Sequence, residues 1–248
     1  LYTKIGSVLS AYAHIFFMAQ PFLERTHVFF RYARVILNDE LLTRLIQERA
    51  YSYIVGTSHN RLSFDVPVSI RQKRTINILF DKPIEDMFRG FNETARNEIR
   101  RTQNMNDLVF TVNDGNWEAV YAMYKAHRHA RNLPLHPLAF LRHCLLFNAY
   151  LKGTLISSIT CYDAKPYLRI QNIFSRISGD DKELRRIAGF AARRLVYEIC
   201  AYGSKNKYQL LDMASANFTD PAKAGITQFK NSFGGVIADE YTYTYKSM

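Results

Sequence analysis

The chain has 248 residues, of which 48% are hydrophobic and 22% are charged. This composition excludes a disordered or low-complexity protein, and the length suffices for one large domain or two small lobes with a buried core. The 33 basic residues exceed the 22 acidic ones, and the formal net charge of +11 favours anionic partners such as phosphates, nucleic acid or anionic lipid.

Cysteine usage and hydropathy bear on the compartment. Cys144, Cys161 and Cys200 lie far apart and form no C-x-x-C motif. An odd and sparse set is typical of a reducing compartment without a disulfide framework, so we expect a cytoplasmic protein. The longest apolar run near the start, residues 8–22, contains polar residues and is shorter than the roughly 20 residues that cross a bilayer. The sequence therefore predicts no membrane span.

Helical and strand patterns follow one another in the first half of the chain. Apolar residues at helical spacing predict a helix over residues 39–50, and a strand is predicted over 51–56. Residues 63–70 and 75–80 are predicted to form paired strands around a charged turn at 71–74. Pro83 opens a predicted long helix that ends near Gln103, and a strand follows over 108–112.

The second half begins with two predicted helices, over residues 116–130 and 137–150. Its later elements are predicted as strands 155–162 and 167–175, a helix 182–202, a strand 208–213, a short helix within 225–235 and a final strand 241–245. In that last strand Tyr241, Tyr243 and Tyr245 alternate with threonines, which predicts one half-buried face. Base stacking on these rings is the alternative.

The order of the last elements is the most informative pattern. A buried strand, a loop, the short helix carrying Phe229-Lys230 and Phe233-Gly234-Gly235, and a final strand follow one long helix. This order resembles the C-terminal half of a FemAB-type acyltransferase, which has the GNAT-like acyl-CoA N-acyltransferase fold. The resemblance implies a mixed α+β fold with a central sheet flanked by helices. It implies a reduced N-terminal lobe at 1–106, a full C-terminal lobe at 107–248, and central strands that splay between 167–175 and 208–213.

The start of the long helix matches a phosphate-binding pattern of that superfamily, [R/Q]-x-x-G-x-[G/A], at Arg186, Gly189 and Ala191. Free backbone N–H groups and the helix dipole bind coenzyme A pyrophosphate at such a terminus. The alternative is a cap at residues 178–181, which would leave Gly189 two turns inside the helix as a packing point. The resemblance also implies that backbone groups near Gln171 and Ile173 polarise the donor carbonyl.

A second basic segment matches the motif R-x-x-I-R-[RK]-[AT] that ends the first-lobe helix in related proteins. Arg96 and Arg100 lie four residues apart and share one helix face, from which guanidinium groups could bind a substrate phosphate or carboxylate. The alternative is a solvated basic face beside Glu93 and Glu98.

The resemblance places the acyl-transfer site beside Phe229 and Lys230. A lysine there stabilises a developing oxyanion or binds a donor phosphate, and the alternative is a surface lysine on an amphipathic turn. Asp212, at the end of a buried strand, would orient the amine or accept its proton, or else cap the following loop.

Four histidines crowd one region without the spacing of a metal site, so no metal is expected; they are His127, His129, His136 and His143. One of them could serve as a general base.

Together these features predict an N-acyltransferase that moves an acyl or aminoacyl group to a small-molecule amine. Acyl-CoA is the expected co-substrate and no cofactor is bound covalently; aminoacyl-tRNA is the alternative donor, and cell-envelope or polysaccharide biosynthesis is a candidate pathway. Two other classes stay open. One is a catalytically silent GNAT-like module that binds RNA or another anionic polymer, and the other is a partner-binding protein with an aromatic interface.

Overall fold

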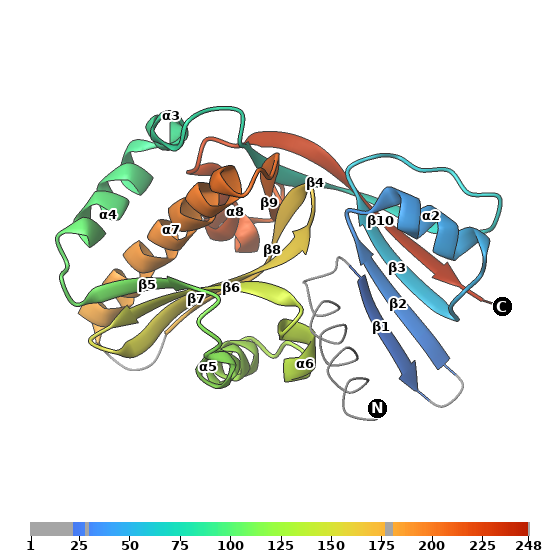
Figure 1. The fold of residues 1–248 in the computed structure, drawn as a ribbon, viewed down its shortest axis with the longest axis horizontal. Coiled ribbons are helices and arrows are strands. Elements are labelled where there is room, and N and C mark those ends of the chain that lie inside the picture. The colour runs from blue at the N-terminus through green and yellow to red at the C-terminus, as the bar shows by residue number, and fades with distance from the viewer. Residues whose placement is uncertain (1–21, 28–29, 177–180, 248) are drawn as a thin grey trace, which may run out of the picture.

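The computed structural model describes residues 22–27, 30–176 and 181–247. The apolar run at 8–22 therefore lies outside the described residues except for its last member, and so does most of the expected cap at 178–181. Within the described residues, ten strands form one mixed sheet, with the order β1-β2-β3-β10-β4-β9-β8-β7-β6-β5 (Figure 1).

The strands on one side of this sheet come from both ends of the chain. They are β1 (Phe22–His27), β2 (Phe30–Ile36), β3 (Tyr53–Ser58), β10 (Val236–Lys246) and β4 (Ser69–Leu79). β10 is antiparallel to both of its neighbours, β3 and β4. The division into lobes 1–106 and 107–248 stays a prediction, and the topology adds that the last strand pairs within the N-terminal half of the sheet.

The other strands form the C-terminal half of the sheet. They are β5 (Leu108–Val112), β6 (Cys144–Leu151), β7 (Thr154–Ala164), β8 (Tyr167–Ser175) and β9 (Leu210–Ala216). The helices are α2 (Asp39–Gln47), α3 (Ile84–Gly90), α4 (Glu93–Gln103), α5 (Trp117–His129), α6 (Leu138–Leu141), α7 (Lys182–Lys205) and α8 (Ala224–Asn231), with a short 3-10 helix, η1, at Pro221–Lys223.

The helices form layers on the sheet (Figure 1). α3, α4 and α7 share one hydrophobic core with the inward side chains of β4 and β6 to β9. α5 and α6 pack on the opposite face against β6, β7 and β8. α2 covers the N-terminal strands, where Tyr243 and Tyr245 of β10 are buried as the tyrosine alternation predicted.

Three predicted elements were wrong. Residues 69–79 form one continuous strand rather than a hairpin, because the charged segment 71–74 contains no Gly, Asn or Pro to reverse the chain. Residues 137–150 give only the four-residue α6 before strand β6, because an apolar run of this kind suits a buried strand as well as a helix. The long helix to Gln103 breaks at Phe91, which is extended and buried, and Asn92 then caps α4 by accepting the amide of Ala95.

The predicted splay between β8 and β9 is confirmed. The two parallel strands pair over only three residues, from Tyr167–Leu210 to Arg169–Asp212. Each strand then carries a bulge, at Gln171 in β8 and at residues 213–214 in β9, where two residues stand opposite Ile76 of β4. A bulge bends its strand and increases its local twist. The strands therefore diverge just beyond Arg169 and Asp212.

Candidate functional site

A buried cluster of charged side chains lies where β8 and β9 separate. Arg169 of β8 forms ion pairs with Asp212 of β9 and with Glu240 of β10, the second at 2.6 Å. The two carboxylate side chains are 0% and 1% exposed, and that of Arg169 is 10% exposed. Strands β8, β9 and β10 are thereby joined by charge, although β4 lies between β9 and β10 in the sheet.

Asp212 has both carboxylate oxygens engaged. Oδ1 accepts from the hydroxyl of Thr75 and from the amide of Ala214 at 2.7 Å, and Oδ2 lies 3.1 Å from Nε2 of His59. Burial alone would raise the pKa of Asp212, but the charge of Arg169 and these hydrogen bonds hold it well below its usual range. The predicted role of proton acceptor does not fit this environment, because no carboxylate oxygen is open; Asp212 holds Arg169 and His59 in place instead.

Lys230 lies at the edge of this cluster. Its ammonium donates to the carbonyl oxygens of Ala214, at 3.1 Å, and Ser215, at 2.8 Å, and the residue is only 6% exposed. Burial lowers its pKa to about 8, while Asp212 and Glu240 oppose that shift. An ammonium has three N–H donors, so two are committed to β9 and one remains for a ligand.

Aromatic residues near Lys230 in the sequence determine how its side chain is oriented. Phe233 is 2% exposed and meets Phe91 edge to face at 5.2 Å, and the partly buried Phe229 also meets Phe233 edge to face at 5.2 Å. These contacts fix the helix face, so Lys230 is directed at β9 rather than at open solvent. Gly234, at φ 65°, follows the helix in the left-handed conformation that glycine favours.

A cavity of about 710 Å³ opens beside Ser215. We call it the basic groove; its cationic lining residues are Arg71, Lys73, Arg74 and Lys223, with Phe218 and Ile226 as exposed apolar members. Lys223 pairs with Asp220 at 3.1 Å, whereas the three β4 cations have no carboxylate within ion-pair distance among the described residues. Burial, and then nearby arginines, lower the pKa of Lys73 against the pull of Glu240. The groove therefore favours an anion.

The residues predicted to bind pyrophosphate lie elsewhere. α7 begins at Lys182, and Asp181 caps it by accepting the amide of Leu184 at 2.9 Å. Gly189 and Ala191 consequently sit about two turns or more inside α7, where backbone amides bond within the helix. Arg186 is exposed and pairs with Glu183 at 2.7 Å. These residues do not form a phosphate loop at the helix start. The packing alternative does not hold either, because a Cβ on Gly189 would meet nothing within 4 Å.

Arg96 and Arg100 are also separate from the cluster, on the α4 layer of the opposite sheet face. Arg96 donates to the carbonyl of Arg89, at 2.9 Å, and to that of Phe91. These hydrogen bonds stabilise the chain where it is not helical between α3 and α4. Arg100 is exposed, and its guanidinium lies 5.5 Å from the centre of the Phe88 ring. Substrate binding by this pair remains a sequence prediction, and the contacts made by Arg96 are structural.

Gln171 and Ile173 lie on β8 past the last residue paired with β9, as predicted. Gln171 is the bulge residue, and its side-chain oxygen accepts from the thiol of Cys144 at 2.9 Å and from Thr160 at 3.3 Å. Ile173 packs against the α7 core. The backbone of this segment is not paired with β9.

Sequence reasoning missed Arg169, Glu240 and His59. A signal was present for one of them, because Arg169 interrupts the apolar run Tyr167–Ser175 and so occupies a buried strand. Glu240 alternates with the tyrosines of β10, and its position in the strand gave no sign that it is buried. His59 directly follows β3 and is brought to Asp212 only by the order of strands, which the sequence did not reveal.

In the part of the chain that the structure describes, no three His, Cys, Asp or Glu side chains converge as a metal ion would require. None of the helices described is both long enough and apolar enough to cross a membrane. Cys144, Cys161 and Cys200 are all buried free thiols.

Comparison with known proteins identifies the fold. No family model and no curated protein matches the chain. FemX superposes with a TM-score of 0.64 at 10% identity, over 89% of this chain and 83% of that one. L-PGS from Bacillus licheniformis superposes with a TM-score of 0.54 at 11% identity, over 92% and 82%. A conserved protein of unknown function from Bacteroides thetaiotaomicron gives 0.53 at 10% identity, over 91% and 82%. The chain thus has a FemAB-like, GNAT-like fold, as the sequence resemblance predicted.

Proposed function

We propose that this protein is an N-acyltransferase that moves an acyl or aminoacyl group from an activated donor to an amine. One observation carries the proposal: Lys230, buried at the edge of the opening between β8 and β9, keeps one N–H available beside unpaired strand backbone. The FemAB-like fold supports this assignment by analogy.

In the proposed reaction the donor carbonyl lies in the opening beyond Arg169 and Asp212. The amine nitrogen attacks the carbonyl carbon, the bond to the donor sulfur or oxygen breaks, and the amine proton ends on that leaving atom. Backbone N–H groups of β8 and the ammonium of Lys230 stabilise the negative charge on the carbonyl oxygen. The ion cluster positions Lys230 indirectly, because Asp212 holds the segment of β9 whose carbonyls bind it.

The donor phosphate is assigned to the basic groove rather than to the start of α7. Arg71, Lys73 and Arg74 face this cavity without carboxylate partners among the described residues, and Ser215 belongs both to the groove and to the Lys230 contacts. A phosphate in the groove would therefore sit beside Ser215, whose backbone carbonyl accepts a hydrogen bond from the catalytic lysine. Acyl-CoA is the first donor to test, and aminoacyl-tRNA is the second because Phe218 offers a ring for a base.

Binding is tested by thermal shift with acetyl-CoA, longer acyl-CoAs, free coenzyme A and deacylated tRNA. The donor should raise the melting temperature by mass action, and Lys73→Gln or Arg74→Gln should reduce that rise. Arg44→Gln, an exposed change on α2, is the matched control. Equal effects from all three variants would mean diffuse charge attraction and would remove the donor site.

Turnover is tested with Lys230→Met against Lys205→Met, an exposed lysine in the last turn of α7 and outside the basic groove. A charged hydrogen bond contributes about 1.5–3 kcal/mol, so Lys230→Met should lower transfer roughly ten- to a hundredfold while binding persists. Wild-type turnover in this variant would exclude the catalytic role. Binding of tRNA without transfer of any group would favour the silent anion-binding module instead.

A further inference from the structure

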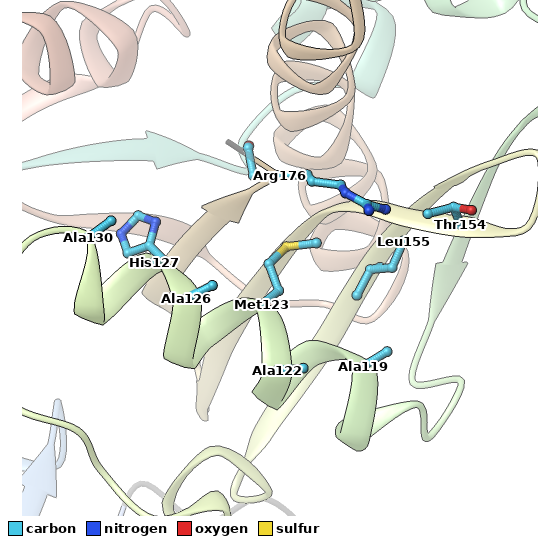
Figure 2. Close-up of a pocket in the computed structure, with 10 residues that line it drawn as sticks. Ala119, Ala122, Met123, Ala126, His127, Ala130, Thr154, Leu155 and Arg176 are labelled. Atoms are coloured by element: carbon cyan, nitrogen blue, oxygen red, sulfur yellow. The ribbon is translucent and has the colours of Figure 1, made fainter. Parts of the chain in front are cut away.

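The basic groove differs in character from a second cavity, of about 550 Å³, between α5 and the adjoining ends of β7 and β8 (Figure 2). Small and apolar side chains form most of that second lining, among them Ala122, Met123, Ala126 and Leu155. The basic groove instead combines cationic side chains with the backbone of β4, and these features are specific enough to select a ligand.

The edge of β4 that faces β9 is unpaired over its first five residues. Residues 69–73 pair with β10 on one side, whereas pairing with β9 on the other side begins only at Arg74. No other backbone hydrogen bond reaches residues 69–73 in the described part of the chain. Backbone N–H and C=O groups of a central strand point to both sides, so some of these groups are directed at the free edge. The five residues extend over roughly 17 Å.

The free edge borders the basic groove because the chain after β9 leaves the sheet. β9 ends at Ala216, which pairs with Arg74, and the following residues 217–219 line the groove instead of continuing the pairing along β4. The groove, of about 710 Å³, therefore lies beside the edge where a further strand would pair. No undescribed segment adjoins residues 69–74 or 215–226 in the sequence.

One face of this edge is cationic. Arg71 and Lys73 are two residues apart and therefore share a face of β4. The described lining of the groove contains no Asp or Glu. The acidic residues of β10, Asp239 and Glu240, stand opposite Arg74 and Lys73 on the side away from the free edge, and Glu240 is buried in the ion cluster. This face of the edge therefore favours anionic side chains in a neighbouring strand.

The other face offers exposed apolar side chains next to Arg74. Ile70 is 44% exposed, and it shares this face with Ile76, which belongs to the core against which α8 packs through Phe229. Ile226 of α8 is 54% exposed and lines the groove. A strand added at this edge would thus meet cations on one face and mainly apolar side chains on the other.

We propose that residues 69–73 bind an extended acidic peptide, which pairs with β4 as an added strand in the basic groove. Main-chain hydrogen bonds to the free edge hold the peptide, and its alternate side chains give selectivity. Carboxylates at every second position meet Arg71 and Lys73. The positions between them meet Ile70 and Ile226, which favours apolar side chains there. Cations on an open edge repel a second copy of the same strand, so a partner of opposite charge fits better than self-association.

Binding of the peptide does not depend on the transferase proposal. A bound peptide would occupy the cations that are assigned to the donor phosphate, so the two ligands should exclude each other. A peptide that binds when no donor raises the melting temperature would support the added strand and remove the donor site.

The first experiment measures binding of capped hexapeptides by calorimetry. Alternating Glu and Val should bind at least tenfold more tightly than the blocked order of three Glu and three Val, because only the alternating order places every carboxylate on one face. Alternating Lys and Val should not bind. Equal affinity for both acidic peptides would mean diffuse charge attraction and would overturn the proposal, as would absence of binding by the alternating peptide. Tighter binding of a thymidylate hexamer would assign the groove to single-stranded nucleic acid instead.

The second experiment tests the backbone contact. An added strand bonds to its neighbour through alternate residues, so N-methylation of one alternate set of peptide amides should weaken binding at least tenfold, and N-methylation of the other set much less. The bound peptide should also slow hydrogen exchange at those amides of residues 69–73 that are not bonded to β10. Equal losses with the two methylated peptides, or unchanged exchange over residues 69–73, would exclude strand pairing.

The third experiment locates the peptide with paired variants. Arg71→Gln should weaken binding of the alternating peptide up to about fivefold, the value of an exposed ion pair, whereas Arg44→Gln on α2 should not. Ile226→Ser should weaken it as well, whereas Ile237→Ser, at a 51% exposed position of β10 outside the groove lining, should not. Equal affinities within both pairs would place the peptide elsewhere and overturn the proposal.

Discussion

Lys230 and Ala214 constrain each other. The ammonium of Lys230 donates to the Ala214 carbonyl at 3.1 Å, and Ala214 has φ 59°, a left-handed conformation that costs a residue with a side chain about 1–2 kcal/mol. Ala214 is also one of the two residues in the β9 bulge. Backbone strain at the edge of the opening is thus maintained by the lysine assigned to catalysis and by the Asp212 carboxylate that accepts the Ala214 amide.

The left-handed conformation of Ala214 predicts that a β-branched residue at this position lowers stability. Ala214→Val should lower the free energy of unfolding by at least about 1–2 kcal/mol, because a β-branched side chain tolerates positive φ poorly. Ala238→Val, in the ordinary part of β10, is the control and should change it by less than about 0.5 kcal/mol. Urea denaturation measures both. A neutral Ala214→Val would mean that the bulge is not strained.

The lowered pKa of Lys230 predicts how stability depends on pH. The pKa is about 8 in the folded chain against an ordinary value of 10.5, so between these values the unfolded chain binds more protons and stability rises with pH. Lys230→Met should remove this rise, of at most about 3 kcal/mol. Lys223→Met should preserve it. Denaturation at pH 7, 9 and 10.5 makes the comparison, and parallel curves for Lys230→Met and wild type would contradict it.

The same pKa predicts the opposite trend for catalysis. The ammonium must be charged to stabilise an oxyanion, so transfer should decline as pH rises through about 8 if the amine acceptor is already unprotonated. A pH profile measured with a low-pKa acceptor separates this decline from deprotonation of the substrate. Lys230→Arg, which stays charged, should shift the decline to higher pH; an unshifted profile would assign it to another group.

The ion cluster predicts strong coupling between Asp212 and Arg169. Asp212→Asn should cost about 3–5 kcal/mol, because it leaves a buried guanidinium with less opposing charge. Arg169→Met should cost a similar amount, and the double variant much less than the sum. The folded pKa of Asp212 lies below 3.8, so its contribution is present above that pH and lost as the pH falls. Additive losses in the double-mutant cycle would show that the pair does not interact.

Substitution by alanine should have opposite effects on stability at two glycine positions. Gly189→Ala should stabilise the chain by about 0.5–1 kcal/mol, because the position is inside α7 and has open space. Gly234→Ala should destabilise it, since φ is 65° and a Cβ would lie 2.3 Å from the backbone oxygen of Gly90. The melting temperatures of the two variants test this. A loss of donor binding in Gly189→Ala would restore the phosphate loop predicted from the sequence.

The sequence predicted the parts of the site that depend on local order. The resemblance carried by the order of the last elements implied a functional lysine at Lys230 and the splay of β8 and β9, and the splay is observed. Of the two interpretations of the pattern at Gly189, the structure supports the cap alternative, because Asp181 caps α7 two turns earlier. A short motif does not by itself fix where a helix begins.

The remaining parts depend on contacts between distant segments. His59 and Asp212 are 153 residues apart, and the order of strands alone brings them together. Residues 71–74 were predicted to form a turn because four polar residues in a row are common in loops. All four pair with β10, and Arg74 pairs with β9 as well, which keeps them extended and makes them one wall of the basic groove.

The insertion of β10 between β3 and β4 has a consequence for how the chain assembles. Among the ten described strands, β1, β2 and β3 connect to the rest of the sheet only through β10, whose residues 236–246 are synthesised after the other nine. During translation β3 therefore keeps one edge unpaired until β10 has been synthesised. Such long-range pairing slows folding and exposes unpaired edges to association with other chains. The same strand delivers Glu240 to Arg169, so the charge cluster can close only when the sheet itself is complete.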